Sequence, residues 1–182
     1  EPAFFYEPSS LKKSQRLFYK RYLPKFFNKA KTIAAVSASF KQDLSLRYKI
    51  TDDKIDVIYP APREAFLPVD ETVREQIKGE YCQGKSYFIS AQGAHSHKSL
   101  MTLLKAFSIF KKRQKSNWKL VITGSIKSHS KSFTESLKTY KYRDDLVLTG
   151  VVKENDLVKL IGSAYALIHS NHWDGASVSL LE

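Results

Sequence analysis

Short apolar runs alternate with segments of helical periodicity from residue 32 onward. This alternation is typical of an α/β sheet built from strand, helix and strand crossover units. In such a sheet the carboxyl ends of the strands lie at one edge. The expected strands are 32–36, 55–59, 87–91, 119–123, 146–151 and 166–169.

The clearest helix follows Lys98, where five apolar residues from Leu100 to Phe110 fall close to every third and fourth position. That spacing indicates one buried helix face. The same spacing recurs over 157–164, which predicts a second helix. A third is expected from Ser39 to Tyr48, because a serine favours a helix start.

The segment YPAPREAFLPVD, residues 59–70, holds three prolines and shows neither helical nor strand periodicity. Proline interrupts both kinds of element, so this segment is interpreted as a linker. We expect residues 1–64 to hold the end of an N-terminal domain with the linker, and residues 65–182 to hold part of a C-terminal domain. The missing initiator methionine predicts a segment of a longer protein.

Charge changes this picture at the beginning of the chain. The formal net charge is +12, and no acid occurs between Glu7 and Asp43. Aromatic residues alternate with these cations, which predicts a basic amphipathic region interrupted at Pro24. One interpretation is a surface for anionic membrane or for a charged acceptor. The alternative is a solvated helix whose aromatic side packs on another domain.

Composition excludes other classes. No apolar run is long enough for a membrane span, and the first residues lack the plan of a signal peptide. The lone Cys82 cannot form an internal disulfide, which suits a reducing compartment. We therefore expect a soluble protein in the cytoplasm, at the inner face of the membrane if the basic region binds lipid.

Glycine is sparse and stands at or near the expected strand ends. In an open parallel sheet, ligands bind at this edge, so the glycines predict a binding site. The alternative is that they only serve tight turns. These residues are Gly93, Gly124, Gly150 and Gly175.

The closing stretch NHWDGASVSLLE follows the last expected strand. Its small residues Gly175, Ala176 and Ser177 let an anion approach the backbone, and a helical pattern begins at Val178. A diphosphate fits such a helix start. Glu182 would accept hydrogen bonds from sugar hydroxyls, and Asp174 would lie on the other side of the anion. A surface loop with two unrelated acids is the alternative.

The string WDGASVSLLE resembles the signature of the retaining glycosyltransferases of family 4 (glycosyl transferase group 1), an acid followed by seven residues and Glu. Other stretches resemble the family in the same order. The resemblance covers roughly residues 31–182. The matching stretches are TIAAVSASFKQDL, DKIDVIYPAP, KSLMTLLKAF, WKLVITG, LVLTGVVKENDLVKL and GSAYALIHS.

The resemblance implies the GT-B architecture, in which two Rossmann-like domains face each other and the C-terminal one holds a nucleotide-sugar donor. This chain would contain a truncated GT-B C-terminal domain with helices on both faces of its sheet. The resemblance assigns the donor ribose to Glu182, the transferred sugar to Asp174 and the diphosphate to Lys98. The backbone of Gly150, Val151 and Val152 would face the base.

The sequence departs from the family pattern at three positions. Asp174 stands where Glu is usual, and Ser179 stands where Pro is usual. The Arg that often follows the glycine of the Gly93 loop is missing, so His95 or His97 would have to substitute. Alternate positions in a strand point to opposite sides, so a histidine metal site is not expected.

We therefore expect a metal-independent retaining hexosyltransferase that uses a nucleoside-diphosphate sugar, needs no cofactor and acts on a glycan or lipid-linked acceptor. The fragment alone should be inactive. Two alternatives stay open. One is a basic nucleic-acid-binding protein, for which no recognised signature is present. The other is a catalytically silent relative that binds nucleotide without turnover.

Overall fold

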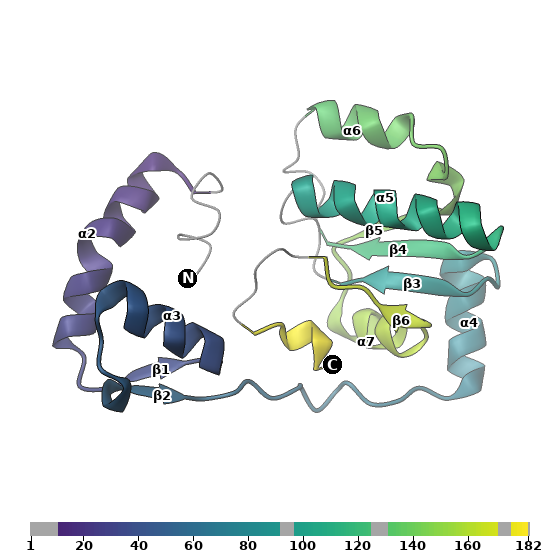
Figure 1. Cartoon of the computed structure of the whole chain (residues 1–182). Coiled ribbons are helices and arrows are strands. Elements are labelled where there is room, and N and C mark those ends of the chain that lie inside the picture. The colour runs from purple at the N-terminus through teal and green to yellow at the C-terminus, as the bar shows by residue number, and fades with distance from the viewer. Residues whose placement is uncertain (1–10, 92–96, 125–130, 171–175, 182) are drawn as a thin grey trace. The chain divides into compact units, whose positions relative to one another are not determined.

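The computed structural model describes residues 11–91, 97–124, 131–170 and 176–181, and it describes only the backbone of 97–98 and 131–134 (Figure 1). The chain divides into two compact units. The first comprises Glu1–Ala61 with Trp173–Val178, and the second comprises Pro62–His172 with Ser179–Glu182.

The first unit contains a two-stranded parallel sheet, in which β1 (Ile33–Ala35) pairs with β2 (Ile55–Val57). A 3-10 turn, Asp52–Lys54, precedes β2. Helix α3 (Ala38–Tyr48) begins after Ser37, whose side chain accepts a hydrogen bond from the Phe40 N–H at 3.2 Å. The expected start at Ser39 is one residue late, because Ser37 rather than Ser39 caps the helix.

Helix α2 (Lys13–Lys29) belongs to the first unit and contains the basic aromatic region. The prediction that Pro24 interrupts this region is wrong, since the helix runs continuously through Pro24. Proline removes one backbone donor, but in an exposed helix water can satisfy the carbonyl left over. Contacts on the C-terminal side of Pro24 also hold the helix, because the Phe27 and Tyr48 rings lie 4.7 Å apart between centroids.

The second unit contains a four-stranded parallel sheet in the order β5-β4-β3-β6. Its strands are β3 (Tyr87–Ser90), β4 (Lys119–Thr123), β5 (Leu146–Gly150) and β6 (Ala166–Leu167). Every one of them begins where the sequence pattern predicts. The expected parallel α/β sheet with helices on both faces is confirmed.

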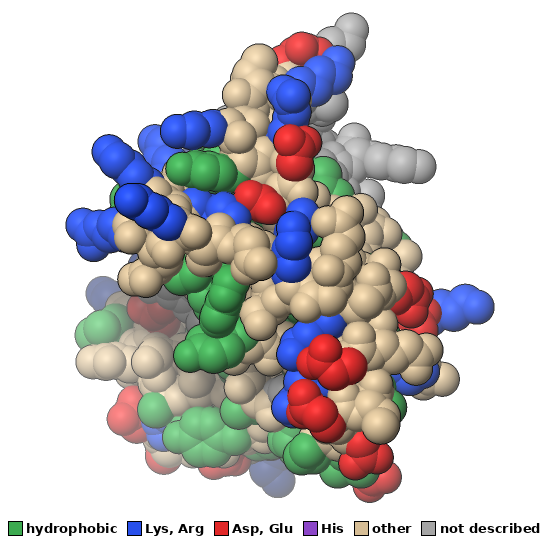
Figure 2. All heavy atoms as spheres, turned by 90° about the vertical axis from the view of Figure 1, so that its right-hand side faces the viewer, with side chains coloured by type: hydrophobic (Ala, Val, Ile, Leu, Met, Phe, Trp, Pro, Cys, Tyr) green, Lys and Arg blue, Asp and Glu red, His purple; other side chains and the backbone are tan. Residues whose placement is uncertain are grey.

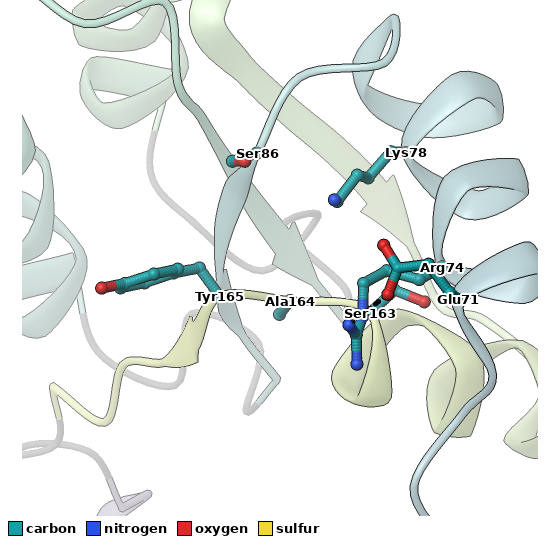
Figure 3. A pocket seen from close by; sticks show the side chains of 7 residues that line it. All are labelled: Glu71, Arg74, Lys78, Ser86, Ser163, Ala164 and Tyr165. Carbon is teal, nitrogen blue, oxygen red and sulfur yellow. Dashed lines mark hydrogen bonds and ion pairs between the residues drawn. The ribbon is translucent and has the colours of Figure 1, made fainter.

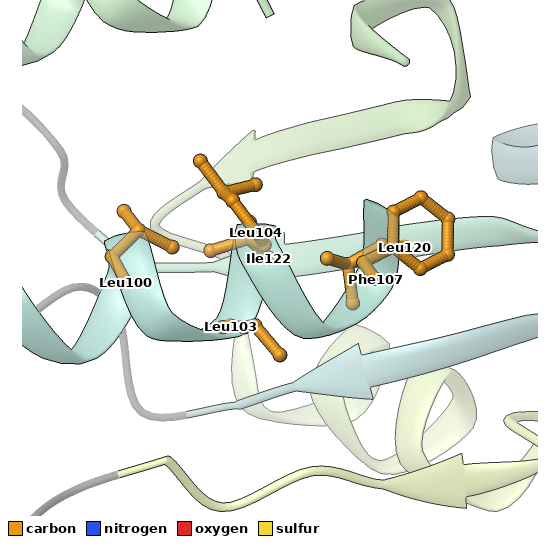
Figure 4. Close-up of a cluster of buried hydrophobic side chains, with 6 residues drawn as sticks. All are labelled: Leu100, Leu103, Leu104, Phe107, Leu120 and Ile122. Atoms are coloured by element: carbon orange, nitrogen blue, oxygen red, sulfur yellow. The ribbon is translucent and has the colours of Figure 1, made fainter. Parts of the chain in front are cut away.

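Helices cover both faces of this sheet. On one face α5 (His97–Gln114) packs its apolar side against Leu120 and Ile122 of β4 (Figure 4). On the other face α4 (Glu71–Cys82) and α7 (Glu154–Gly162) pack against Val121, the alternate residue of β4. Every residue of β4 is buried, as expected for a strand covered on both sides. Helix α6 (Lys131–Lys138) adds Leu137 to the α5 layer.

A buried ion network lies at the amino ends of β4 and β5. Asp145 Oδ2 lies 2.8 Å from Lys111 Nζ, and Asp145 Oδ1 lies 3.4 Å from Lys119 Nζ. The two lysine side chains are only 6% and 7% exposed. Asp145 ends the 3-10 turn Arg143–Asp145 that leads into β5. One carboxylate is therefore shared by two buried cations, from α5 and β4.

The linker has no helix or strand between β2 and α4, and it runs beside α7. At one end of α7, Arg63 Nη1 lies 2.5 Å from Glu154 Oε1. At the other end, Val69 packs against Gly162, where an added Cβ would lie 2.8 Å from Val69 Cγ1. The linker is thus attached to both ends of α7. In the described part of the chain, no helix is long and apolar enough to cross a membrane.

We expect Gly162→Ala to lower the free energy of unfolding by about 1–2 kcal/mol. Overpacking in a closed site costs about 1–3 kcal/mol, and the better helix propensity of alanine returns part of that. The double variant Gly162→Ala, Val69→Ala relieves the contact, so the two changes should couple favourably in urea unfolding. Strictly additive effects would contradict the packing of Val69 on Gly162.

Candidate functional site

The carboxyl edge of the four-stranded sheet is the candidate site. Ser90 and Thr123 end β3 and β4 and are 5% and 2% exposed, so the strand ends form a buried floor. The Gly124 N–H donates to the Gly150 carbonyl at 2.7 Å, which ties the turns after β4 and β5 together. Small and polar residues therefore line this edge, while the apolar core lies behind it.

The strand order places a topological switch point within this edge. The chain passes from β3 to β4 and β5 on one side, then returns to β6 on the other side of β3. Crossovers leave in opposite directions at such a point, and ligands of open α/β sheets bind in the crevice that results. Helix α5 begins on the carboxyl side of β3.

Several predicted site residues lie outside the described residues. These are Gly93, Asp174, Gly175 and Glu182. Lys98 is the second residue of α5, but only its backbone is described. The roles predicted for their side chains therefore stay predictions. The fold does place the start of α5, which lies at the carboxyl end of β3.

The predicted base-contacting turn is described in full. Gly150 has φ of +69°, a conformation that glycine adopts without strain, and no atom lies within 4 Å of where a Cβ would stand. Turn geometry alone thus accounts for this glycine. Val151 is 81% exposed, whereas Val152 packs against the core between α4 and α7. The turn therefore presents Val151 outward and is fixed by Val152.

The remaining predicted residues, Ala176, Ser177 and Val178, fall in the first compact unit, and the site role predicted for them stays a prediction. A single 3-10 turn, Val178–Leu180, stands where the pattern predicts the start of an α-helix. The expected α-helical seat for a diphosphate is therefore not seen in the described residues.

Groups that could support metal or thiol chemistry are few in the described chain. No cluster of three His, Cys, Asp or Glu side chains occurs among the residues that the structure describes. His169 follows β6 and is half-buried, while His95 and His172 lie outside the described residues, as does the His97 side chain. Burial raises the pKa of the Cys82 thiol to about 11, so Cys82 is neutral at pH 7 and a poor nucleophile.

A pocket of about 330 Å³ lies at the opposite, amino edge of the sheet (Figure 3). Its two cations are already paired within α4, Arg74 with Glu71 at 2.6 Å and Lys78 with Glu75 at 2.7 Å. The Tyr165 ring points away from the other labelled side chains and stacks edge-on against Trp118. Because parallel strands bind ligands at their carboxyl ends, this pocket is not the candidate site.

The chain is similar to known proteins over most of its length. The model of the family described as glycosyl transferases group 1 matches residues 74–182. The chain is 22% identical over 181 residues to the O-antigen chain mannosyltransferase RfbU of Salmonella typhimurium (strain LT2), covering 98% of this chain and 46% of that protein. The chain thus spans about half the length of this curated relative.

Two solved structures share the fold. One is WaaG, a glycosyltransferase involved in lipopolysaccharide biosynthesis, with a TM-score of 0.77, 14% identity and coverage of 92% of this chain and 46% of WaaG. The other is Anabaena HepE in complex with UDP-glucose, with a TM-score of 0.66, 12% identity and coverage of 88% and 43%. These structures confirm the GT-B type of fold, and the family model matches more than half of the chain. The chain therefore belongs to the glycosyl transferases group 1 family.

Proposed function

We propose that the protein is a glycosyltransferase that moves a sugar from a nucleoside-diphosphate donor to a glycan or lipid-linked acceptor. The observation that carries this proposal is the family match over residues 74–182, which includes all four strands of the sheet and its switch point. The HepE structures, which hold UDP or UDP-glucose, support a nucleotide-sugar donor. In this proposal the donor lies at the carboxyl edge.

The proposed chemistry uses charge compensation by the chain itself. When the sugar leaves, negative charge accumulates on the diphosphate. The amide groups at the start of α5 and the Lys98 ammonium would stabilise that charge without a metal ion. Groups held in place before the reaction are effective because they need no reorganisation at the moment of transfer.

The two acids have different proposed roles. Glu182 would accept hydrogen bonds from the ribose hydroxyls, and Asp174 would contact the transferred sugar. Asp174 is one methylene shorter than the Glu usual in the resembling family, so it would favour a donor whose hydroxyl approaches more closely. The exposed Val151 turn would lie against the base. The proposed transfer retains the configuration at the anomeric carbon, and the proposed compartment is the cytoplasm.

The experiment is release of nucleoside diphosphate by the full-length protein from a panel of UDP-, GDP- and ADP-sugars, with a lipid extract as the acceptor source. We expect release from one donor class, unchanged by EDTA. Loss of release with EDTA, restored by added Mg²⁺, would contradict metal independence. Nucleotide binding without release from any donor would contradict transfer and indicate the catalytically silent alternative.

A further inference from the structure

One side of α2 exposes apolar and basic side chains together, and we call it the aromatic-basic face. Leu17 is 67% exposed, Phe18 48% and Phe26 53%, although residues of this kind are normally buried. Contiguous exposed apolar residues mark an interaction surface. The face consists of Leu17, Phe18, Arg21, Tyr22, Lys25, Phe26 and Lys29.

The aromatic rings of this face form an ordered row. Phe18, Tyr22 and Phe26 follow one another at intervals of four residues, so they lie on one side of the helix. The ring centroids of Phe18 and Tyr22 are 4.9 Å apart, and those of Tyr22 and Phe26 are 6.3 Å apart. Lys25 Nζ lies 5.6 Å from the Tyr22 ring centroid. Because neighbouring rings contact each other, the row is ordered before any partner binds.

Contacts on the opposite side of α2 hold this row outward. The Phe27 and Tyr48 rings pack edge-on with centroids 4.7 Å apart, and Lys54 Nζ donates to the Asn28 carbonyl at 3.1 Å. Phe27 therefore supplies the contact with the small core of the first unit. The neighbouring Phe26 cannot turn inward without breaking this contact, so the described residues of the first unit leave the aromatic-basic face exposed.

The charge of α2 differs from that of α4, whose cations are paired with acids of the same helix. α2 carries six cations and no acid. In α4, by contrast, Arg74 and Lys78 each pair with a glutamate three residues earlier. Figure 2 shows the consequence on the side of the molecule that includes α4, where basic and acidic side chains lie next to one another. The cations of α2 have no acidic partners within their own helix, so their charge is available to attract an anionic surface.

We propose that the aromatic-basic face docks on an anionic membrane surface. Aromatic rings of an interfacial helix enter the boundary between headgroups and acyl chains, while long basic side chains extend to the lipid phosphates. Both kinds of side chain are needed, and α2 offers both on one side. A purely electrostatic polyanion site would need only the cations. The proposal goes beyond donor binding and does not depend on it.

The test is sedimentation of the full-length protein with phosphatidylcholine vesicles, with and without phosphatidylglycerol. We expect binding only when phosphatidylglycerol is present. The variant Arg21→Gln, Lys25→Gln, Lys29→Gln should lower the partition coefficient by about 10²-fold, given the usual contribution of each basic residue near an anionic surface. The variant Phe18→Ser, Tyr22→Ser, Phe26→Ser should also lower it, and the loss should persist at high salt.

A matched control removes three exposed cations from the other unit, in Lys112→Gln, Arg113→Gln, Lys115→Gln. It should bind vesicles like the wild type, which separates a local face from general net charge. Two results would overturn the proposal. One is equal binding by the wild type and the α2 variants, as when the rest of the protein covers the face. The other is full binding by the aromatic variant, which indicates a polyanion site.

Measuring nucleotide binding by the same variants separates the membrane proposal from the proposed transferase function. The α2 variants should bind nucleoside diphosphate like the wild type, and their thermal unfolding should be unchanged because every substituted residue is exposed. Loss of vesicle binding with intact nucleotide binding supports the membrane face alone. Intact vesicle binding without nucleotide binding would reject only the donor site.

Discussion

Replacing Lys98 by alanine is expected to lower turnover of the full-length protein by about 10²–10³-fold, the usual effect of removing one group that stabilises transition-state charge. Lys98 lies in the first turn of α5, at the carboxyl end of β3. Its ammonium would act on the leaving diphosphate, where charge is greatest in the transition state. Because the donor keeps its other contacts, the Michaelis constant should change less than turnover.

Two further variants make this result specific. Lys98→Arg keeps the positive charge and should retain much more activity than Lys98→Ala. Lys105 is exposed on the same helix, away from its start, so Lys105→Ala should behave like the wild type. Turnover that is unchanged in Lys98→Ala would contradict the role assigned to Lys98, even if nucleotide still binds.

The largest effect on stability is expected from Asp145→Asn. This change keeps the shape of the side chain but leaves two buried ammonium groups without a counter-charge. Breaking a buried pair in this way costs about 3–5 kcal/mol. Both lysines still donate hydrogen bonds to backbone carbonyls, Lys111 to that of Ser116 and Lys119 to that of Asp144. We therefore expect a loss of about 3 kcal/mol in urea unfolding.

The neighbouring residue provides the control. The Asp144 side chain is 92% exposed, and it lies 3.7 Å from Arg143 Nε. Exposed pairs contribute little, so Asp144→Asn should change the free energy of unfolding by less than about 0.5 kcal/mol. Similar effects of the two substitutions would show that the Asp145 network is not the reason for the stability of this sheet edge.

The strands were predictable because buried parallel strands appear as continuous apolar runs. The bounds of β4 match the prediction residue for residue. Helices α4 and α6 were not predicted. In α4 the apolar positions are sparse, with Val73 and Ile77 among charged residues, and Gly79 weakens the helical pattern. Such a helix is stabilised mainly by packing of its narrow apolar stripe against the rest of the fold. The sequence alone does not show which element the stripe packs against.

The sequence indicated where the candidate site lies in the sheet, but it did not indicate the side-chain contacts around the sheet. Glycines at strand ends indicated the carboxyl edge, and Gly124 and Gly150 do lie at that edge with positive φ. The network of Lys111 and Lys119 with Asp145 was missed, because its members are 34 and 26 positions from the acid and only the folded sheet brings them together. The attachment of the linker to α7 was missed for the same reason.

The most direct test of the donor site is calorimetric titration of the full-length protein with UDP, GDP and ADP, repeated with Glu182→Ala. A carboxylate that accepts hydrogen bonds from a ribose contributes to affinity for every nucleotide that binds. We predict selective binding of one nucleoside diphosphate and weaker binding of it by Glu182→Ala. Absence of binding to all three, or binding that Glu182→Ala leaves unchanged, would contradict the donor site proposed for this chain.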